Sequence, residues 1–279
     1  MNTPLDAPRS SDDLYLARAA DTGDVSVLRP IMTGDVFRAI DIPGVECVEG
    51  DEERFGMVVS HPCSMREGST LKSGVQVIRV VKCDPIGLDE WPKRYYDRMP
   101  LPDLTVIADP DDVSADDPEA EVQVRTQEGA HAALLDFRGR VPSTRLDLSQ
   151  RVACLTDEGV SFLHQRMSHF ETRYAPEIDK LMDACRAVFA EIELWENWNE
   201  TLVDRSRIGG SKKLQAELDR VGEIFDRTLS EKRPIPNKKN GWYTLRDDLK
   251  LTRKHAGARR EILKLLSEHS GALSQAGLT

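Results

Sequence analysis

Long hydrophobic runs are absent from this sequence, in which no stretch of about 18 apolar residues is available to form a transmembrane helix. The N-terminal segment carries no apolar core behind a basic start, so it does not have the pattern of a secretory signal. Its Pro, Ser and Asp content instead predicts a mobile leader over residues 1–27. The sequence therefore predicts a protein that does not associate with a membrane.

Disulfide frameworks and the common catalytic signatures are missing as well. The five cysteines are odd in number, widely spaced and form no CxxC pair, which is typical of a reducing compartment and predicts a cytoplasmic protein. No GxGxxG, HExxH or GxSxG motif occurs, and no GxxxxGK followed by Ser or Thr. These absences argue against dinucleotide-binding, zinc-protease, serine-hydrolase and P-loop chemistry, and we expect no cofactor and no bound metal.

Charge is unevenly distributed along the chain, whose formal net charge is −10. The first 200 residues hold 21 basic and 38 acidic residues, whereas those from Thr201 onward hold 17 basic and 10 acidic ones. The segment from Asp103 to Glu121 has eight acidic residues and no basic one. The basic part can meet an acidic surface of the same chain or a polyanion, but a solvated helical surface of uneven charge is the simpler explanation.

Residues 28–155 have the pattern of a β-rich domain. Short apolar runs recur between Gly-, Pro- and Asp-containing turns, with no long helix between them, which predicts a compact antiparallel β-barrel. The predicted strands are Val36–Ile42, Met57–Ser60, Val75–Val81, Leu104–Ala108, Val122–Val124, Ala133–Phe137 and Val152–Leu155.

After Leu155 the apolar residues recur at three- and four-residue steps. This period predicts an α-helical region over residues 156–270 and a frayed tail over residues 271–279, so the fold class is α+β. Thr156 is the expected cap of the first helix, and Thr244 with Asp247 forms a capping-box-like start for the last. Four helices are predicted, beginning near Thr156, Ile178, Gly210 and Thr244.

One short segment concentrates chemically capable side chains. The apolar strand at Met57 leads directly into Ser60 and His61, and Arg54 precedes it. A guanidinium stabilises the charge that develops on a phosphoryl group, and an imidazole of near-neutral pKa can move the proton of a ribose 2′-hydroxyl. The segment therefore suits metal-free cleavage of a phosphodiester. The competing structural explanations are an Arg54 on a barrel rim and a His61 in the turn before Pro62.

The segment from Gly34 to Ser60 resembles the opening block of the PemK/MazF family of toxin-like small barrels. That block runs Gly-Asp, an apolar strand, Asp-x-Pro, a Gly-containing acidic loop, Arg, an apolar strand and Ser. It reads here Gly34-Asp35, Val36-Phe37, Asp41-Ile42-Pro43, Gly44-Val45-Glu46, Arg54 and Met57-Val58-Val59-Ser60, with Val75–Val81 as the next strand. The resemblance implies an SH3-like antiparallel barrel. In active members it implies metal-independent cleavage of single-stranded RNA, with Arg54 matching a catalytic arginine.

The sequence departs from the family pattern at two positions. Phe55 follows Arg54 where the family usually has proline, and the second catalytic position, a Thr or Ser after the following strand, falls near Asp84. If the chain is catalytic, we expect Arg54 to stabilise the phosphoryl charge and His61 to act as acid and base. Ser60 or Asp84 would then orient the ribose. A helical region also follows the barrel, and minimal toxins of this type lack one.

The cysteines suggest two further chemistries. A zinc site would form if Cys47, His61, Cys63 and Cys83 converged, but His-x-Cys is a poor ligand spacing. Cys63 would be a nucleophile with His61 or His131 as its base, but nothing else in the sequence assembles an oxyanion hole. Both hypotheses are weaker than the phosphodiester hypothesis.

A basic segment with interleaved aromatic residues lies near the C-terminus. Cations beside flat aromatic rings are typical of surfaces that contact a nucleic-acid backbone and stack a base. Asp247, Asp248 and Glu261 interrupt the segment, so a solvated helix face is the alternative. The candidate nucleic-acid-binding residues are Lys238, Lys239, Trp242, Arg246, Lys250, Arg253 and Lys254.

Two classes of function remain. The first is a toxin-like or bacterial host-defence protein directed at single-stranded RNA, either a ribonuclease or an RNA-binding descendant of one. The second is a non-catalytic adaptor or scaffold subunit, whose barrel and helices bind a protein or nucleic acid in a multi-subunit assembly. A ribonuclease requires Arg54 and His61 on one solvent-open surface, whereas an adaptor requires an exposed apolar patch.

Overall fold

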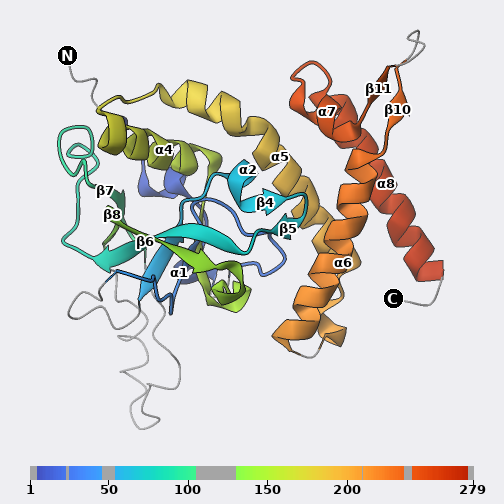
Figure 1. Ribbon diagram of the computed structural model, residues 1–279, viewed down its shortest axis with the longest axis horizontal. Coiled ribbons are helices and arrows are strands. Elements are labelled where there is room, and N and C mark those ends of the chain that lie inside the picture. Colours follow the sequence, from blue (N-terminus) through green and yellow to red (C-terminus); the bar gives the residue numbers. More distant parts are fainter. Residues whose placement is uncertain are drawn as a thin grey trace. The chain divides into compact units, whose positions relative to one another are not determined.

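The protein has an α+β fold, in which an N-terminal antiparallel sheet is followed by a C-terminal helical region. The computed structural model describes residues 5–22, 25–45, 54–104, 130–208, 210–235 and 241–275. The chain divides into two compact units, shown with the element labels in Figure 1. The N-terminal unit comprises residues 1–27, 31–65 and 72–184, and the helical unit comprises residues 28–30, 66–71 and 185–279.

A seven-stranded antiparallel sheet, curled into a half-barrel, forms the framework of the N-terminal unit (Figure 1). Its strand order is β1-β9-β2-β3-β6-β8-β7. The bounds are β1 Tyr15–Arg18, β2 Val36–Phe37, β3 Phe55–Val58, β6 Gly74–Lys82, β7 Arg98–Leu101, β8 His131–Pro142 and β9 Arg151–Leu155.

The burial of apolar side chains explains why these segments form strands. All four residues of β3 and all five of β9 are buried, so these two strands lie inside the unit rather than along a solvated face. The longest pairing joins β6 to β8, and its register shifts between Ile78 and Val80. Such an irregularity bends a strand and increases its twist, which is one way in which a sheet curls.

Helix α4, Asp157–Thr172, follows β9 directly and contacts β7 and β9. The Thr156 hydroxyl accepts the N–H of Gly159, as the sequence predicts, and Asp157 and Glu158 occupy the first turn. The helix ends at Arg173, whose backbone is left-handed with φ of 62°. This unit also contains two short helices, α1 Ala19–Thr22 and α2 Pro62–Met65.

The helical unit is built on the C-terminal part of α5, Ile178–Leu202, within which the division between the units falls. The Trp198 ring is fully buried and makes an edge contact with Phe225, and Trp195 stacks on the same Phe225 ring. The remaining helices and the small hairpin are α6 Ser211–Ser230, α7 Leu245–Lys250, α8 His255–Gln275, β10 Arg233–Pro234 and β11 Trp242–Tyr243.

Three sequence-based boundaries differ from the structure. The predicted leader contains β1, and before it Asp6 exchanges two hydrogen bonds with the Gln165 side chain of α4. The predicted fourth helix is two helices, because residues 251–254 form a turn between α7 and α8, although the Thr244–Asp247 capping box is present. Helix α8 also extends to Gln275, four residues beyond the predicted start of the frayed tail at Gly271.

The predicted strands compare as follows. Strands β6 and β9 lie where the sequence predicts them, β2 is shorter than expected and β8 is longer, and β3 has the expected length but begins two residues earlier. Strands β1 and β7 were not expected, since both are short and lack an apolar run. The predicted strand Val122–Val124, and all but the first residue of Leu104–Ala108, lie outside the described residues.

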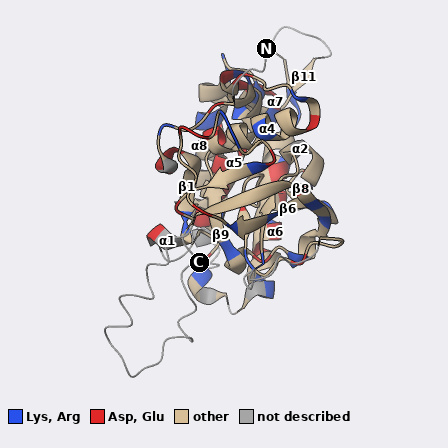
Figure 2. Cartoon of the chain, turned by 90° about the vertical axis from the view of Figure 1, so that its left-hand side faces the viewer, with Lys and Arg blue, Asp and Glu red and all other residues tan. Residues whose placement is uncertain are grey.

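Figure 2 shows Lys and Arg intermixed with Asp and Glu rather than collected on one element. Arg259 of α8, for example, forms a bidentate pair with Glu193 of α5 at 2.6 and 2.8 Å.

Within the part of the chain that the structure describes, no helix is both long enough and apolar enough to span a bilayer.

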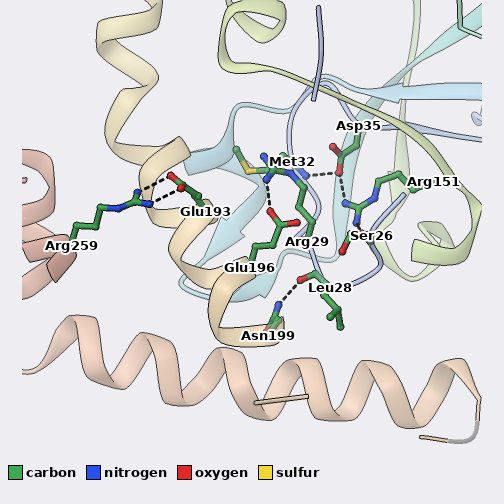
Figure 3. A network of polar contacts seen from close by, with 10 residues as sticks. All are labelled: Ser26, Leu28, Arg29, Met32, Asp35, Arg151, Glu193, Glu196, Asn199 and Arg259. Atoms are coloured by element: carbon green, nitrogen blue, oxygen red, sulfur yellow. Dashed lines mark hydrogen bonds and ion pairs between the residues drawn. The ribbon is translucent and has the colours of Figure 1, made fainter. Parts of the chain in front are cut away.

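Two short segments from the N-terminal half of the chain belong to the helical unit. In residues 28–30, Arg29 pairs with Glu196 at 2.6 Å and the Leu28 carbonyl accepts a hydrogen bond from Asn199 (Figure 3). In residues 66–71, which form the hairpin of β4 Arg66–Glu67 and β5 Thr70–Leu71, the Arg66 guanidinium lies 4.9 Å from the Trp195 ring centroid. The helical unit therefore includes two segments that precede its helices in the sequence by more than a hundred residues.

Two glycine substitutions test this packing. A Cβ added at Gly222 of α6 would lie 2.9 Å from the Ser69 Cβ of the hairpin and 3.1 Å from the Trp195 ring, whereas at Gly257 of α8 it would meet nothing within 4 Å. We expect Gly222→Ala to lower the free energy of unfolding by about 1–3 kcal/mol through overpacking. Gly257→Ala, the control, should raise it by roughly 0.5–1 kcal/mol through helix propensity. Urea denaturation measures both, and a stabilising Gly222→Ala would contradict the docked hairpin.

Candidate functional site

Gly34 opens the segment that carries the sequence motif, and its surroundings explain why glycine is needed there. Its φ is +88°, a left-handed conformation that other residues rarely adopt. A Cβ at this position would lie 2.9 Å from the Leu155 Cβ, and the Gly34 N–H donates to the Val58 carbonyl at 2.8 Å. The glycine of the Gly-Asp pair therefore permits the close packing of three strands.

Asp35 forms a buried ion pair that the sequence does not reveal. Its Oδ2 accepts hydrogen bonds from Arg151 at 2.9 Å and from the Met32 N–H at 3.0 Å, and the side chains of both charged partners are at most 1% exposed (Figure 3). Arg151 also donates to the Ser26 carbonyl. The pair links the chain just before β2 to the first residue of β9, so Asp35 has a structural role.

Strand β3 separates the two residues that the phosphodiester hypothesis combines. Arg54 precedes the strand and His61 follows it, and β3 pairs with β6 from Phe55 opposite Val80 to Val58 opposite Val77. Arg54 and His61 therefore lie beyond opposite ends of this four-residue strand.

Arg54 lies at the end of the sheet where β6 ends. Its φ is +48°, its carbonyl accepts the Ile40 N–H, and its guanidinium pairs with Asp41 at 2.6 Å. The side chain is 41% exposed, so the guanidinium is accessible at the rim. Asp84 is exposed just beyond Lys82, the last residue of β6, and thus lies at this same end.

Ser60 and His61 lie at the other end of β3. Ser60 is buried, its Oγ accepts the Gln76 N–H at 2.6 Å, and its carbonyl accepts a hydrogen bond from the Thr33 hydroxyl. The hydroxyl thus continues the β3–β6 pairing where the backbone ladder stops. His61 is exposed and stacks on His164 of α4 with 5.9 Å between ring centroids. Burial, reinforced by His61, lowers the pKa of His164 to about 4.

The basic segment near the C-terminus is engaged in part within the helical unit. Arg246 pairs with Glu191 at 2.9 Å and Asp226 at 2.6 Å, and Lys254 pairs with Asp248 at 2.6 Å. Lys250 and Arg253 are exposed and make no ion pair with any described residue, and the Trp242 side chain is 62% exposed. Lys238 and Lys239 lie outside the described residues.

The cysteine hypotheses fall mainly outside the part that the structure describes. Cys47 is not among the described residues, and nothing is described of the Cys63 side chain. Cys83 is free, and burial raises the pKa of its thiol, which disfavours a reactive thiolate. Among the described side chains, no group of three or more His, Cys, Asp or Glu residues is placed to hold a metal ion.

A surface that the sequence interpretation missed combines aromatic and basic residues in the N-terminal unit. Residues 91–98 read Trp-Pro-Lys-Arg-Tyr-Tyr-Asp-Arg, and the Tyr96 ring packs on His169 of α4 with 5.0 Å between centroids. Lys93 and Arg94 are exposed in the same segment, and Arg173 is exposed at the end of α4. The alternation of aromatic and cationic residues is the signal in the sequence, but the segment lacks the apolar run by which strands are predicted.

Comparison of the chain with protein-family models, with curated proteins and with solved structures finds no match. The geometry of the described residues gives Gly34, Asp35 and Ser60 structural roles, whereas Arg54, His61, Asp84 and Tyr96 are accessible to solvent.

Two matched Asp→Asn substitutions separate the structural from the exposed part of the motif. Asp35→Asn removes the buried carboxylate charge that faces Arg151, so we expect the free energy of unfolding to fall by about 3–5 kcal/mol. Asp41→Asn breaks an exposed Arg54 pair of similar length and should change it by less than about 1 kcal/mol. Equal effects of the two substitutions in urea denaturation would contradict the structural role of Asp35.

Proposed function

We propose that the protein is a toxin-like or host-defence-associated RNA-binding protein, built on an SH3-like barrel of PemK/MazF type, that does not cleave RNA. One observation carries this proposal. Strand β3 lies between Arg54 and His61 and pairs with β6 along its length, which supports two separate positions at opposite ends of the strand rather than one reaction centre.

The other groups of the motif support the same reading. The Ser60 hydroxyl is buried and engaged with the Gln76 N–H, which makes it a poor group to orient a ribose. Asp84 is exposed at the end of the sheet opposite to His61. A general acid and base must lie within hydrogen-bond reach of the proton that it moves, and β3 lies between His61 and Arg54, the cation of the motif.

RNA is the proposed ligand on two grounds. The opening block from Gly34 to Ser60 resembles a family whose active members act on single-stranded RNA. In addition, the N-terminal unit presents exposed cations around the aromatic Tyr96–His169 pair, although its half of the chain is acidic overall. Aromatic rings flanked by cations suit a single-stranded nucleic acid, because bases stack on the rings while the cations meet phosphates.

A second candidate is the metal-independent endoribonuclease, which the accessibility of Arg54 favours. Its guanidinium is 41% exposed, on the same end of the sheet as Asp84, and its pair with Asp41 is solvent-exposed and weak. A cleaving enzyme would then need an acid and base other than His61 at that end.

The two candidates differ in a direct assay with a mixed single-stranded RNA pool in EDTA. We expect the wild type to retard the RNA in a binding assay without cleaving it, and Arg54→Ala to give the same lack of cleavage. Cleavage by the wild type that Arg54→Ala abolishes and His61→Ala preserves would replace the proposal with the endoribonuclease. Neither binding nor cleavage would contradict an RNA-directed function and leave the adaptor that binds a protein partner.

A further inference from the structure

The segment of residues 91–98 is held rigidly on α4 by one buried guanidinium. Arg166 donates to the Tyr95 carbonyl at 3.0 Å, to the Arg98 carbonyl at 3.2 Å and to the Trp91 carbonyl at 2.9 Å. It also lies 5.0 Å from the Trp91 ring centroid and is 1% exposed. Three carbonyls bound by one fixed donor define the path of the backbone through this segment.

This path presents Tyr96 at the surface. Tyr95 has a left-handed backbone with φ of 60°, which turns the chain before Tyr96. The Tyr96 ring rests on His169 at an interplanar angle of 35°, and Tyr96 is 37% exposed whereas His169 is 4% exposed. The exposed Tyr96 ring is thus packed against the buried imidazole ring of His169.

Burial favours the neutral form of the ring beneath Tyr96. Burial, together with the positive charges of Arg173 and Arg166, lowers the pKa of His169. Its buried Nδ1 makes no hydrogen bond to a described residue. A neutral imidazole adds a flat apolar support to Tyr96 and leaves the charge of the surface to the exposed side chains around it.

Those exposed side chains are mainly cations without strong counter-charges. Lys93 and Arg173 form no ion pair with any residue that the structure describes. Arg94 pairs with Glu90 at 3.3 Å, but the side chains are 67% and 34% exposed, so the pair is weak. The acidic Asp97 is neutralised by Arg98 at 2.7 Å, which also lowers the pKa of its carboxyl group.

We propose that this surface, formed by Tyr96 and its cations Lys93, Arg94 and Arg173, is the contact site for single-stranded RNA. A base stacks on the exposed part of the Tyr96 ring while the cations meet the adjacent phosphates. This inference rests on the proposed function and deepens it by naming the site. An acidic peptide would use the same cations, but it offers no flat ring for Tyr96.

The site differs from the basic segment that the sequence indicates near the C-terminus. Arg246 and Lys254 are engaged with carboxylates there, whereas Lys250 and Arg253 are exposed, and the exposed Trp242 has no ring partner among the described residues. The Tyr96 ring, by contrast, is packed on the buried ring of His169. RNA binding should therefore depend on Tyr96 and not on Trp242.

Fluorescence anisotropy with a short labelled single-stranded RNA tests the site on the full chain. Loss of one stacking contact predicts that Tyr96→Ala weakens binding about tenfold, whereas Tyr96→Phe keeps the ring and binds within about twofold of the wild type. Trp242→Ala is the matched control and should leave affinity unchanged. The urea denaturation midpoint of each variant should equal that of the wild type, which shows that the variant retains its fold.

The salt dependence of RNA binding distinguishes the contribution of the cations from that of the Tyr96 ring. Each of Lys93→Ala and Arg173→Ala should reduce the slope of log affinity against log salt by about 0.7, because one phosphate contact is lost. Lys72→Ala, which removes an exposed lysine located before the start of β6, should leave the slope unchanged. Tyr96→Ala should weaken binding at every salt concentration without altering the slope.

The outcomes distinguish this inference from the proposed function. No RNA binding by the wild type contradicts the proposed function and, with it, the site. Binding by the wild type that Tyr96→Ala leaves intact contradicts the site alone, as does a loss confined to Trp242→Ala. A poly-glutamate peptide that competes as strongly as RNA would contradict base stacking. An RNA without bases that binds as tightly as the intact RNA would contradict it as well. Equal binding to DNA of the same sequence would overturn the assignment to RNA.

Discussion

The buried pair of Asp35 and Arg151 is the constraint on which the N-terminal sheet depends. The two charges are excluded from water, so each needs the other, and any arrangement that parted them would leave an unpaired buried charge. The pair fixes the chain before β2 against the first residue of β9, and Met32 and Ser26 tie the preceding loop to the same two side chains. Strand β9 then leads directly into α4, so the helix that carries His164, Arg166 and His169 is placed by the same constraint.

With β2 fixed in this way, the separation of the motif residues follows. Strand β3 pairs with β2 on one side and β6 on the other, and it runs in a single extended segment. Residues that are close in sequence are therefore spread along the strand, with Arg54 at one end and His61 at the other. For this reason the resemblance favours RNA cleavage, whereas the positions of Arg54 and His61 favour RNA binding without cleavage. Several residues that carry the resemblance also hold the sheet together, so they can persist in a protein that does not cleave RNA.

The parts of the fold that were predictable from the sequence are those with local signals. Strands β6 and β9 have continuous apolar runs, α4 has its Thr156 cap, and α7 has its Thr244 capping box. The missed parts depend on partners distant in sequence. Strand β1 forms only against β9, the 66–71 hairpin packs on helices more than a hundred residues later, and Asp35 gives no sign of its partner Arg151. The Tyr96 surface was missed because its aromatic residues are organised by Arg166, which lies 70 residues further along the chain.

The molecule that emerges has a sheet locked by a buried charge pair and a candidate contact surface on the helix that this sheet positions. Ultraviolet cross-linking of the wild-type protein to single-stranded RNA, followed by mass spectrometry of the linked peptides, tests this account most directly, because it locates the RNA without altering the chain. The account predicts that the cross-linked peptides contain residues 91–98 and the end of α4 near Arg173. Cross-links confined to residues 54–61 or to the segment around Trp242 would contradict it.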